Sequence, residues 1–332
     1  MKLRNKYKLF LMSDSASNKV LSIILLSYYS KERLPKAYER LNEVLGPERI
    51  PFELVIVDDG SKDNSYQIAL GLEKQYPNVF AYKLSRNYTS HYSAFAGLSV
   101  CNGGCAVLVP DDEQLPYTTV VEAYRLWEQG HQVIVPHREM RDEPWMKRNT
   151  SELFYKIMNA FSDIQFPPGG ADSFFIDREV IDILNERIHP IRTTTITEIL
   201  RLGFDPYPLP YIRPFGDNKK SRWSFKKKYN LAKDFFFSSS TFPIKLITYL
   251  GIGFALFAFL LIIIYVYGRL FGNQSFWKLD EVPGWVSTIT IIGFFSGLTL
   301  FSLGIIAEYV WRIFEEVKAR PGYVIRKKTK DK

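Results

Sequence analysis

A charge-free apolar stretch in the last third of the chain constrains the fold most strongly. From Leu246 to Tyr267 the sequence reads LITYLGIGFALFAFLLIIIYVY, without a charged side chain. About twenty such residues cross the hydrocarbon core of a bilayer as a helix. The range Val286–Val310 repeats the pattern, with Glu308 as its only charged residue. We therefore expect two transmembrane helices, which return the chain to its starting side.

Lysine and arginine residues gather outside the two apolar stretches. The flanking basic residues include Lys226, Lys227, Lys228, Lys233, Lys245, Arg312, Lys318, Arg320, Arg326 and Lys327, whereas the connecting loop holds only Arg269 and Lys278. Because basic residues favour the cytoplasmic side, we expect an integral membrane protein of a bacterial inner membrane whose N-terminal domain and C-terminus are both cytoplasmic. Anionic lipid headgroups then account for much of the net charge of +8, and no nucleic acid is needed as a partner.

Five segments are expected from these patterns. They are an N-terminal extension (1–19), a soluble domain (20–222), amphipathic interfacial helices (223–245), a two-helix transmembrane domain (246–311) and a cytoplasmic tail (312–332). The third segment combines lysines with Phe235, Phe236 and Phe237, a composition typical of helices in the membrane interface. A simple linker is the alternative for this segment.

The soluble domain alternates between short apolar runs and helical patterns. Strands are expected at Val20–Tyr28, Phe52–Val57, Val79–Leu84 and Ala106–Val109, and helices at Leu34–Leu45, Ser65–Gln75 and Tyr92–Val100. This alternation predicts an α/β domain with a mostly parallel sheet. Ligands of such sheets bind at the carboxyl ends of the strands, so the residues that follow each run are the candidates for a site.

Acidic residues follow the second predicted strand. Asp58, Asp59 and Ser61 surround Gly60, which permits a tight turn. Carboxylates at a strand end can accept hydrogen bonds from a nucleotide base and its ribose. Taken alone, the same residues also suit an ordinary turn with a helix N-cap.

A second acidic group follows Ala106–Val109. Asp111, Asp112 and Glu113 are adjacent, and Gln114 comes next. Adjacent acids repel one another unless a cation joins them, and Mg²⁺ or Mn²⁺ takes oxygen ligands of this kind. A solvated acidic loop is the alternative.

The two acidic groups, in this order and followed by two apolar spans, resemble the inverting family 2 glycosyltransferases. These enzymes have the glycosyltransferase-A fold, a Rossmann-like α/β domain. The closest likeness within the family is to polyprenyl-phosphate sugar synthases, such as bactoprenol glucosyltransferases and dolichyl-phosphate mannose synthases. The most specific part of the resemblance is the second span and its exit, which contain Gly284, Trp285, Leu303, Gly304, Glu308, Tyr309, Arg312, Glu316, Val317, Lys318, Arg320, Pro321 and Tyr323.

The resemblance implies a role for each candidate residue. Nucleotide-sugar binding falls to Asp58, Asp59, Ser61, Arg86, Asn87 and Asp111, and binding of Mg²⁺ or Mn²⁺ to Asp112 and Gln114. Contact with the lipid phosphate falls to Arg213, Lys220, Ser221 and Arg222, and catalysis to Asp172, Asp112 and Arg213.

The sequence departs from the family pattern at three places. Pro110 stands where the family has its first metal-segment Asp, so Asp111 must substitute for it or the metal site is weaker. Tyr88 and Thr89 replace a Gly after the Arg-Asn pair, and Phe174 replaces the Arg of a Gly-Asp-Phe-Arg segment. These changes leave the identity of the donor sugar open. They also leave a catalytically degenerate membrane scaffold as an alternative.

The implied reaction transfers one sugar from a UDP- or GDP-hexose to undecaprenyl or dolichyl phosphate, with inversion. An enzyme that extends a lipid-linked saccharide is the alternative. The expected partners are the nucleotide-sugar, the polyprenyl phosphate and the bilayer, with a homo-oligomer such as a tetramer. The short loop 268–284 is too small for a catalytic domain, so a flippase and a second glycosyltransferase are expected to act downstream.

Overall fold

A computed structural model describes residues 19–112, 114–138, 171, 173–191, 193–212, 246–254, 256–257, 260, 263, 284–318 and 320–326. Internal contacts divide the chain into two compact units. The first unit comprises Met1–Ser239 together with Pro321–Lys332, and the second comprises Ser240–Arg320. The last residues of the chain therefore belong to the same unit as the N-terminal domain.

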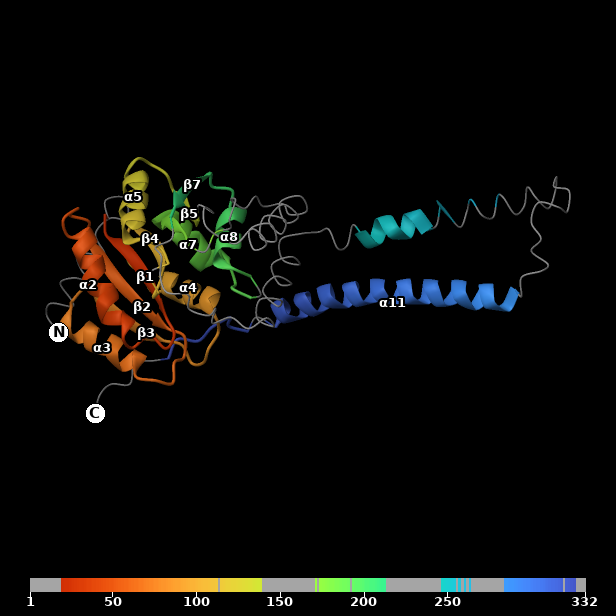
Figure 1. Ribbon diagram of the computed structural model, residues 1–332, viewed down its shortest axis with the longest axis horizontal. Coiled ribbons are helices and arrows are strands. Elements are labelled where there is room, and N and C mark those ends of the chain that lie inside the picture. Colours follow the sequence, from red (N-terminus) through yellow and green to blue (C-terminus); the bar gives the residue numbers. More distant parts are fainter. Residues whose placement is uncertain are drawn as a thin grey trace. The chain divides into compact units, whose positions relative to one another are not determined.

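A seven-stranded mixed sheet forms the centre of the first unit (Figure 1). Its strands are β1 (Leu21–Ser27), β2 (Phe52–Asp58), β3 (Val79–Lys83), β4 (Cys105–Pro110), β5 (Val133–Arg138), β6 (Phe175–Asp177) and β7 (Pro206–Tyr211), in the spatial order β3-β2-β1-β4-β6-β5-β7. The short strand β6 is antiparallel to both of its neighbours, and all other pairs are parallel. The expected mostly parallel α/β sheet is confirmed, with β6 as its antiparallel member.

Helices cover both faces of the sheet. One hydrophobic cluster takes residues from α2 (Arg33–Leu45), α3 (Ser65–Gln75) and α5 (Tyr117–Glu128), and the other from α4 (Ser90–Leu98), α7 (Arg178–Arg187) and α8 (Thr195–Arg201). Alternate residues of a strand point to opposite faces, and β1 shows this directly. Ile23 and Leu25 lie in the first cluster, while Ile24 between them lies in the second. Burial on both faces explains the continuous apolar runs.

The predicted elements agree closely with those observed up to β4. The helix α3 has the predicted bounds, Ser65–Gln75. The helix α4 begins at Ser90 rather than at Tyr92 and ends at Leu98. The strand β4 extends by one residue at each end, so it begins at Cys105 and ends at Pro110.

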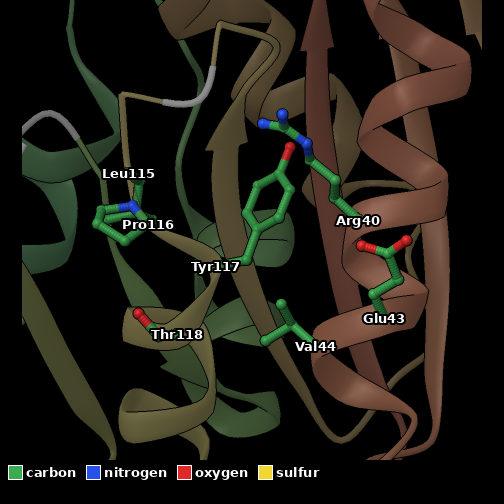
Figure 2. Close-up of a pocket in the computed structure, with 7 residues that line it drawn as sticks. All are labelled: Arg40, Glu43, Val44, Leu115, Pro116, Tyr117 and Thr118. Atoms are coloured by element: carbon green, nitrogen blue, oxygen red, sulfur yellow. The ribbon is translucent and has the colours of Figure 1, made fainter. Parts of the chain in front are cut away.

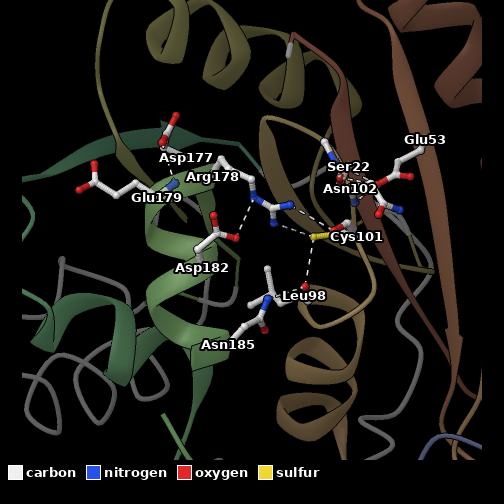
Figure 3. A network of polar contacts seen from close by, with 11 residues as sticks. Ser22, Glu53, Leu98, Cys101, Asn102, Asp177, Arg178, Glu179, Asp182 and Asn185 are labelled. Atoms are coloured by element: carbon white, nitrogen blue, oxygen red, sulfur yellow. Dashed lines mark hydrogen bonds and ion pairs between the residues drawn. The ribbon is translucent and has the colours of Figure 1, made fainter. Parts of the chain in front are cut away.

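A buried polar network joins the amino ends of the central strands (Figure 3). The carboxylate of Glu53 accepts hydrogen bonds from Ser22 Oγ at 2.7 Å and from the Asn102 backbone N–H at 2.6 Å. Arg178 donates to the carbonyl oxygen of Cys101 at 3.2 Å. Cys101 and Cys105 are both buried free thiols, and burial raises the pKa of Cys101 to about 12. Buried polar contacts therefore connect the strands and loops at this end of the sheet.

The second unit contains the long helix α11 (Gly284–Val317). Its part Ile291–Val317 is long and apolar enough to cross a membrane, and an 18-residue window within it has a mean hydropathy of 1.8. The helix continues seven residues beyond Val310, where the sequence pattern predicted its end. Near that end, Arg312 pairs with Glu308 at 3.3 Å.

Of the first predicted span, residues 246–254 are helical, and most of the remainder lies outside the described residues. The interfacial segment 223–245 also lies outside them. Within the described part of the chain, one helix meets the criteria of length and composition for a membrane span. The two-span architecture is therefore not confirmed and stays a prediction.

Candidate active site

The site begins at the point where the strand order of the sheet reverses. The strands β1 and β4 are parallel neighbours, and β2 and β3 follow on the far side of β1. The crevice at such a switch point, outside the carboxyl ends of the strands, is where ligands of open α/β sheets bind. The loops that follow β1, β2, β3 and β4, together with the end of β5, meet at this edge because these strands run in the same direction. We call it the carboxyl edge.

Asp58 is the last residue of β2 and is fully buried. Its Oδ2 accepts a hydrogen bond from the Ser61 backbone N–H at 3.1 Å and lies 3.7 Å from Lys83 Nζ. Burial raises the pKa of Asp58, although the Ser61 hydrogen bond and the Lys83 ammonium oppose that rise. Among the described residues, none donates a hydrogen bond to Asp58 Oδ1. A buried acceptor without a partner costs free energy, so this oxygen is suited to a ligand.

Asp59 fixes the loop between β3 and α4. Its two carboxylate oxygens accept hydrogen bonds from the backbone N–H groups of Tyr88 at 2.7 Å and Thr89 at 2.9 Å. Thr89 has φ of 85°, a conformation that β-branched residues rarely adopt. The hydrogen bond from its N–H helps to hold it there. Burial raises the pKa of Asp59 to about 6, against these two hydrogen bonds.

Gly60 allows the loops after β2 and β3 to touch. Its φ is +70°, and a Cβ at this position would lie 2.5 Å from the carbonyl carbon of Arg86 and 2.8 Å from the Asn87 nitrogen. The Arg86 guanidinium stacks over the Tyr88 ring at 4.3 Å. Asp58, Asp59, Ser61, Arg86 and Asn87 are therefore brought together, as the prediction of a shared nucleotide site requires.

Asp111 is engaged within the protein. It is 8% exposed and accepts a hydrogen bond from Ser30 Oγ, and its Oδ2 lies 2.9 Å from the Arg33 guanidinium. Burial raises the pKa of Asp111 to about 6, and the Ser30 hydrogen bond and the Arg33 charge both oppose the rise. This carboxylate thus connects the end of β4 to the start of α2. Its expected role in donor binding stays a prediction.

Asp112 and Gln114 lie together next to Arg138. Gln114 Nε2 donates to the exposed Asp112 carboxylate, and Arg138 donates to Gln114 Oε1 at 3.0 Å. The described residues include no cluster of three His, Cys, Asp or Glu side chains that could hold a metal. Mg²⁺ commonly takes only one or two carboxylates and completes its coordination with substrate phosphates and water. Asp112 supplies a carboxylate for an ion bound in that way, and Gln114 Oε1, which accepts from Arg138, keeps a second lone pair.

Several predicted residues cannot be placed. Asp172 lies outside the described residues, as do the four predicted lipid-phosphate contacts Arg213, Lys220, Ser221 and Arg222. Phe174, at the family's arginine position, is 1% exposed and packs in the core. Its carbonyl oxygen accepts a hydrogen bond from the Leu108 N–H at 3.0 Å. A buried phenyl ring at this position cannot replace the charge of an arginine.

A cavity of about 280 Å³ lies between α2 and α5 (Figure 2). Its lining residues are Arg40, Glu43, Val44, Leu115, Pro116, Tyr117 and Thr118. The side chains of Arg40 and Tyr117 point toward each other across it in Figure 2. No residue predicted for the site lines this cavity, so the candidate site is the carboxyl edge and not this hollow.

Comparison with known proteins identifies the family. The sequence model described as "Glycosyl transferase family 2" matches residues 22–184. The uncharacterized glycosyltransferase sll0501 of Synechocystis sp. is 30% identical over 307 residues, which cover 92% of this chain and 94% of that protein. The chain belongs to glycosyl transferase family 2. It is therefore a glycosyltransferase with an α/β fold of the glycosyltransferase-A type.

Other family 2 relatives carry a more specific name. The bactoprenol glucosyl transferase of Shigella phage SfII is 29% identical over 309 residues, which cover 92% of this chain and 97% of that protein. Among solved structures, glucosyl-3-phosphoglycerate synthase from Mycobacterium tuberculosis aligns with a TM-score of 0.45 at 15% identity, covering 67% of this chain and 78% of that one.

Sequence reasoning missed four residues that contact the candidate site: Ser30, Arg33, Lys83 and Arg138. A signal existed for two of them. Lys83 and Arg138 are basic residues at the ends of strands that reach the carboxyl edge. A cation at such a position is a candidate partner for an anionic ligand or an acidic neighbour. Ser30 and Arg33 had no comparable signal, because only the fold brings them to Asp111.

Proposed function

We propose that this family 2 enzyme transfers a single sugar from a UDP- or GDP-hexose to a polyprenyl phosphate, undecaprenyl or dolichyl phosphate, with inversion. One observation carries the proposal. The relatives named bactoprenol glucosyl transferase align over 92% of the chain. That share extends beyond the family domain 22–184 into the apolar helix α11. The resemblance therefore includes both the donor site and the part of the chain suited to a lipid substrate.

The donor nucleotide is assigned to the carboxyl edge. Asp58 Oδ1, which accepts no hydrogen bond from the described residues, and the adjoining Asp59–Ser61 turn are assigned to accept hydrogen bonds from the nucleoside. Arg86 and Asn87 border the same turn. Asp112 and Gln114 are the residues that would hold Mg²⁺ or Mn²⁺, which when bound neutralises charge on the leaving diphosphate. Arg138 orients Gln114 through a hydrogen bond of 3.0 Å.

The chemistry is one displacement. A phosphate oxygen of the lipid forms a bond to the anomeric carbon, and the bond from that carbon to the nucleoside diphosphate breaks with its electron pair. A phosphate monoester has a second pKa of about 6, so the attacking oxygen is largely ionised at neutral pH. A strong general base is not required, and Asp172 is assigned to orienting or polarising the reactants. Arg213, Lys220, Ser221 and Arg222 are assigned to the lipid phosphate, where cations offset the repulsion between two anions.

The membrane-facing part of the proposal uses the apolar helix. A long prenyl chain stays in the bilayer, so the enzyme must bring its site to a membrane surface. The exposed apolar side chains of α11 suit such an anchor. We assign two spans, a cytoplasmic catalytic domain and a homotetramer to the working protein. The product then needs a flippase and a second glycosyltransferase to reach a glycan across the membrane.

The proposal is tested with the purified full chain, undecaprenyl phosphate, Mg²⁺ or Mn²⁺ and a panel of UDP- and GDP-hexoses. Mass spectrometry of the lipids reads the product. The expected product carries one hexose on a monophosphate and disappears with Asp112→Ala. Addition of sugar only to a lipid-linked saccharide would instead select the chain-extending enzyme. Donor binding without turnover on any acceptor would select a non-catalytic scaffold.

A further inference from the structure

The C-terminal tail, residues 321–326, lies against the free edge of β3. Leu84 and Ile325 form an antiparallel bridge. The Ser85 N–H donates to the Val324 carbonyl oxygen at 2.9 Å, and the Arg326 N–H donates to the Lys83 carbonyl oxygen at 2.8 Å. Figure 1 shows this dark-blue segment beside β3. Because β3 is the outermost strand on this side of the sheet, the tail pairs with the outer edge through this single bridge, just beyond the end of β3.

The tail is closely fitted to the domain. Tyr323 and Ile325 pack against the cluster that contains the buried Leu84. The Tyr323 hydroxyl donates to the Phe95 carbonyl oxygen at 3.4 Å. At Gly322 a Cβ would lie 2.0 Å from the Pro190 carbonyl oxygen, so a larger residue would force the backbone to move. The tail therefore makes specific, closely packed contacts with the domain.

The bridge falls where β3 ends and the donor loop begins. Lys83, whose carbonyl oxygen accepts from the tail, donates its Nζ to the Ser61 carbonyl oxygen at 2.8 Å and lies 3.7 Å from Asp58. Ser85, whose N–H donates to the tail, immediately precedes Arg86, and the Arg86 backbone packs on Gly60. If the tail only protected an exposed edge strand, it could pair with any part of β3. Pairing at Lys83–Ser85 instead holds the residues that shape the turn Asp58–Ser61.

We propose that residues 321–326 are a positioning element for the nucleotide-sugar site. By fixing Lys83 and Ser85, the tail holds the loop 85–89 against the turn 58–61. The affinity for the donor therefore depends on a segment that does not itself touch the nucleotide. This inference rests on the proposed function, because it assumes that the carboxyl edge binds the nucleotide-sugar.

A single backbone hydrogen bond provides the test. Arg326→Pro removes the N–H that donates to Lys83, and the extended Ile325 before it is compatible with a following proline. Arg326→Ala is the matched control, because it keeps the N–H and removes only an exposed side chain. Gly322→Ala is a second variant, which displaces the tail at a different point. All are compared as full-length protein for the KM of the donor, the KM of undecaprenyl phosphate, kcat, the melting temperature and amide hydrogen exchange at residues 85–89.

Arg326→Pro and Gly322→Ala are expected to raise the donor KM three- to tenfold and to speed exchange at residues 85–89. The KM of the lipid and the melting temperature should stay near those of the wild type, as should every property of Arg326→Ala. An equal rise in KM for both substrates, or a donor KM that rises only as the melting temperature falls, would mean that the tail only stabilises the fold. Either result would overturn the inference. Unchanged donor KM would also overturn it. If the wild-type protein binds no UDP- or GDP-hexose, the proposed function fails as well, which is a distinguishable result.

Discussion

The guanidinium of Arg33 lies 2.9 Å from the carboxylate of Asp111, at the point where the strand order of the sheet reverses. The charge of Asp111 is therefore compensated within the protein. Its neighbour Asp112 is exposed and contacts Gln114 instead. Two adjacent acids thus have different environments and different roles. Asp111 holds the loops together, whereas Asp112 can bind an ion.

Asp111→Asn and Asp112→Asn should affect catalysis very differently. The first change keeps the shape of a buried side chain and its hydrogen bond to Ser30, so activity should stay within about tenfold of wild type. The second removes the charge assigned to the metal, and loss of one stabilising group for a leaving anion costs roughly 100-fold or more. Steady-state rates with donor and lipid in excess measure both. A larger loss in Asp111→Asn would identify Asp111 as the metal ligand.

Removal of Arg33 should destabilise the protein more than neutralisation of Asp111. Arg33→Met leaves a carboxylate buried without its cation, which costs several kcal/mol at fully buried sites. Because the Arg33 side chain is 24% exposed, we expect about 2 kcal/mol, measured by urea unfolding of the full chain in detergent. In the double variant Arg33→Met with Asp111→Asn, most of this loss should be recovered. Additive losses would show that the two groups do not interact.

Removal of divalent ions should abolish sugar transfer and preserve the fold. Treatment with a chelator followed by Mg²⁺ or Mn²⁺ is expected to restore the rate, with chelator already saturated by Ca²⁺ as the control. Gln114→Ala should raise the Mg²⁺ concentration needed for half-maximal rate, because one oxygen donor is lost together with its hydrogen bond to Arg138. A rate that survives chelation would mean that the cations of the chain alone stabilise the leaving group.

Gly60→Ala and Gly71→Ala form a matched pair at the donor site and away from it. A methyl group at Gly60 would meet the Arg86 backbone at 2.5 Å, at a φ of +70°, whereas at Gly71 nothing lies within 4 Å. Gly60→Ala should raise the donor KM at least tenfold. Gly71→Ala lies inside α3 and should raise the unfolding free energy by about 0.5–1 kcal/mol. Equal donor KM values in the two variants would contradict the packing of the two loops.

The stability contributed by Asp59 should depend on pH. Burial raises its pKa to about 6, above the value of about 3.9 for an exposed Asp. The folded state therefore binds a proton more tightly than the unfolded state. This contribution is fully present below about pH 4 and is lost as the pH rises through about 6.

Comparison with Asp59→Asn isolates this effect, because asparagine does not titrate. The difference in unfolding free energy between wild type and variant should shift by about 2 kcal/mol against the wild type between pH 4 and pH 7. Urea unfolding at several pH values measures it. A difference that does not change with pH would show that Asp59 ionises as it does in water.

The first half of the sheet could be predicted from the sequence because its strands are buried on both faces. β1 and β2 therefore appear as mostly apolar runs, and acids stand at the end of β2. The second half gives no such signal. β6 has only three residues, and β7 contains Pro206, Pro208 and Pro210. Prolines two residues apart direct their missing N–H groups to the same side, which an edge strand such as β7 tolerates.

The candidate site was predictable only as far as its residues follow strands in the sequence. Asp58 and Asp112 could be recognised because they come within three residues of the ends of predicted strands. The partners that determine their properties come from elsewhere in the chain. Lys83 reaches Asp58 from β3 and Arg138 reaches Gln114 from β5. Contacts of this kind depend on strand order, which hydrophobic patterns do not specify.

The contact between the tail and β3 also determines the order in which the protein can be completed. Ribosomes make a chain from its N-terminus, so residues 20–138 emerge long before residues 321–326. The bridge between Leu84 and Ile325 can form only after every residue of α11 has been synthesised. The outer edge of the sheet therefore stays open until residues 321–326 have been made, and a chain that stops short of Pro321 leaves it open.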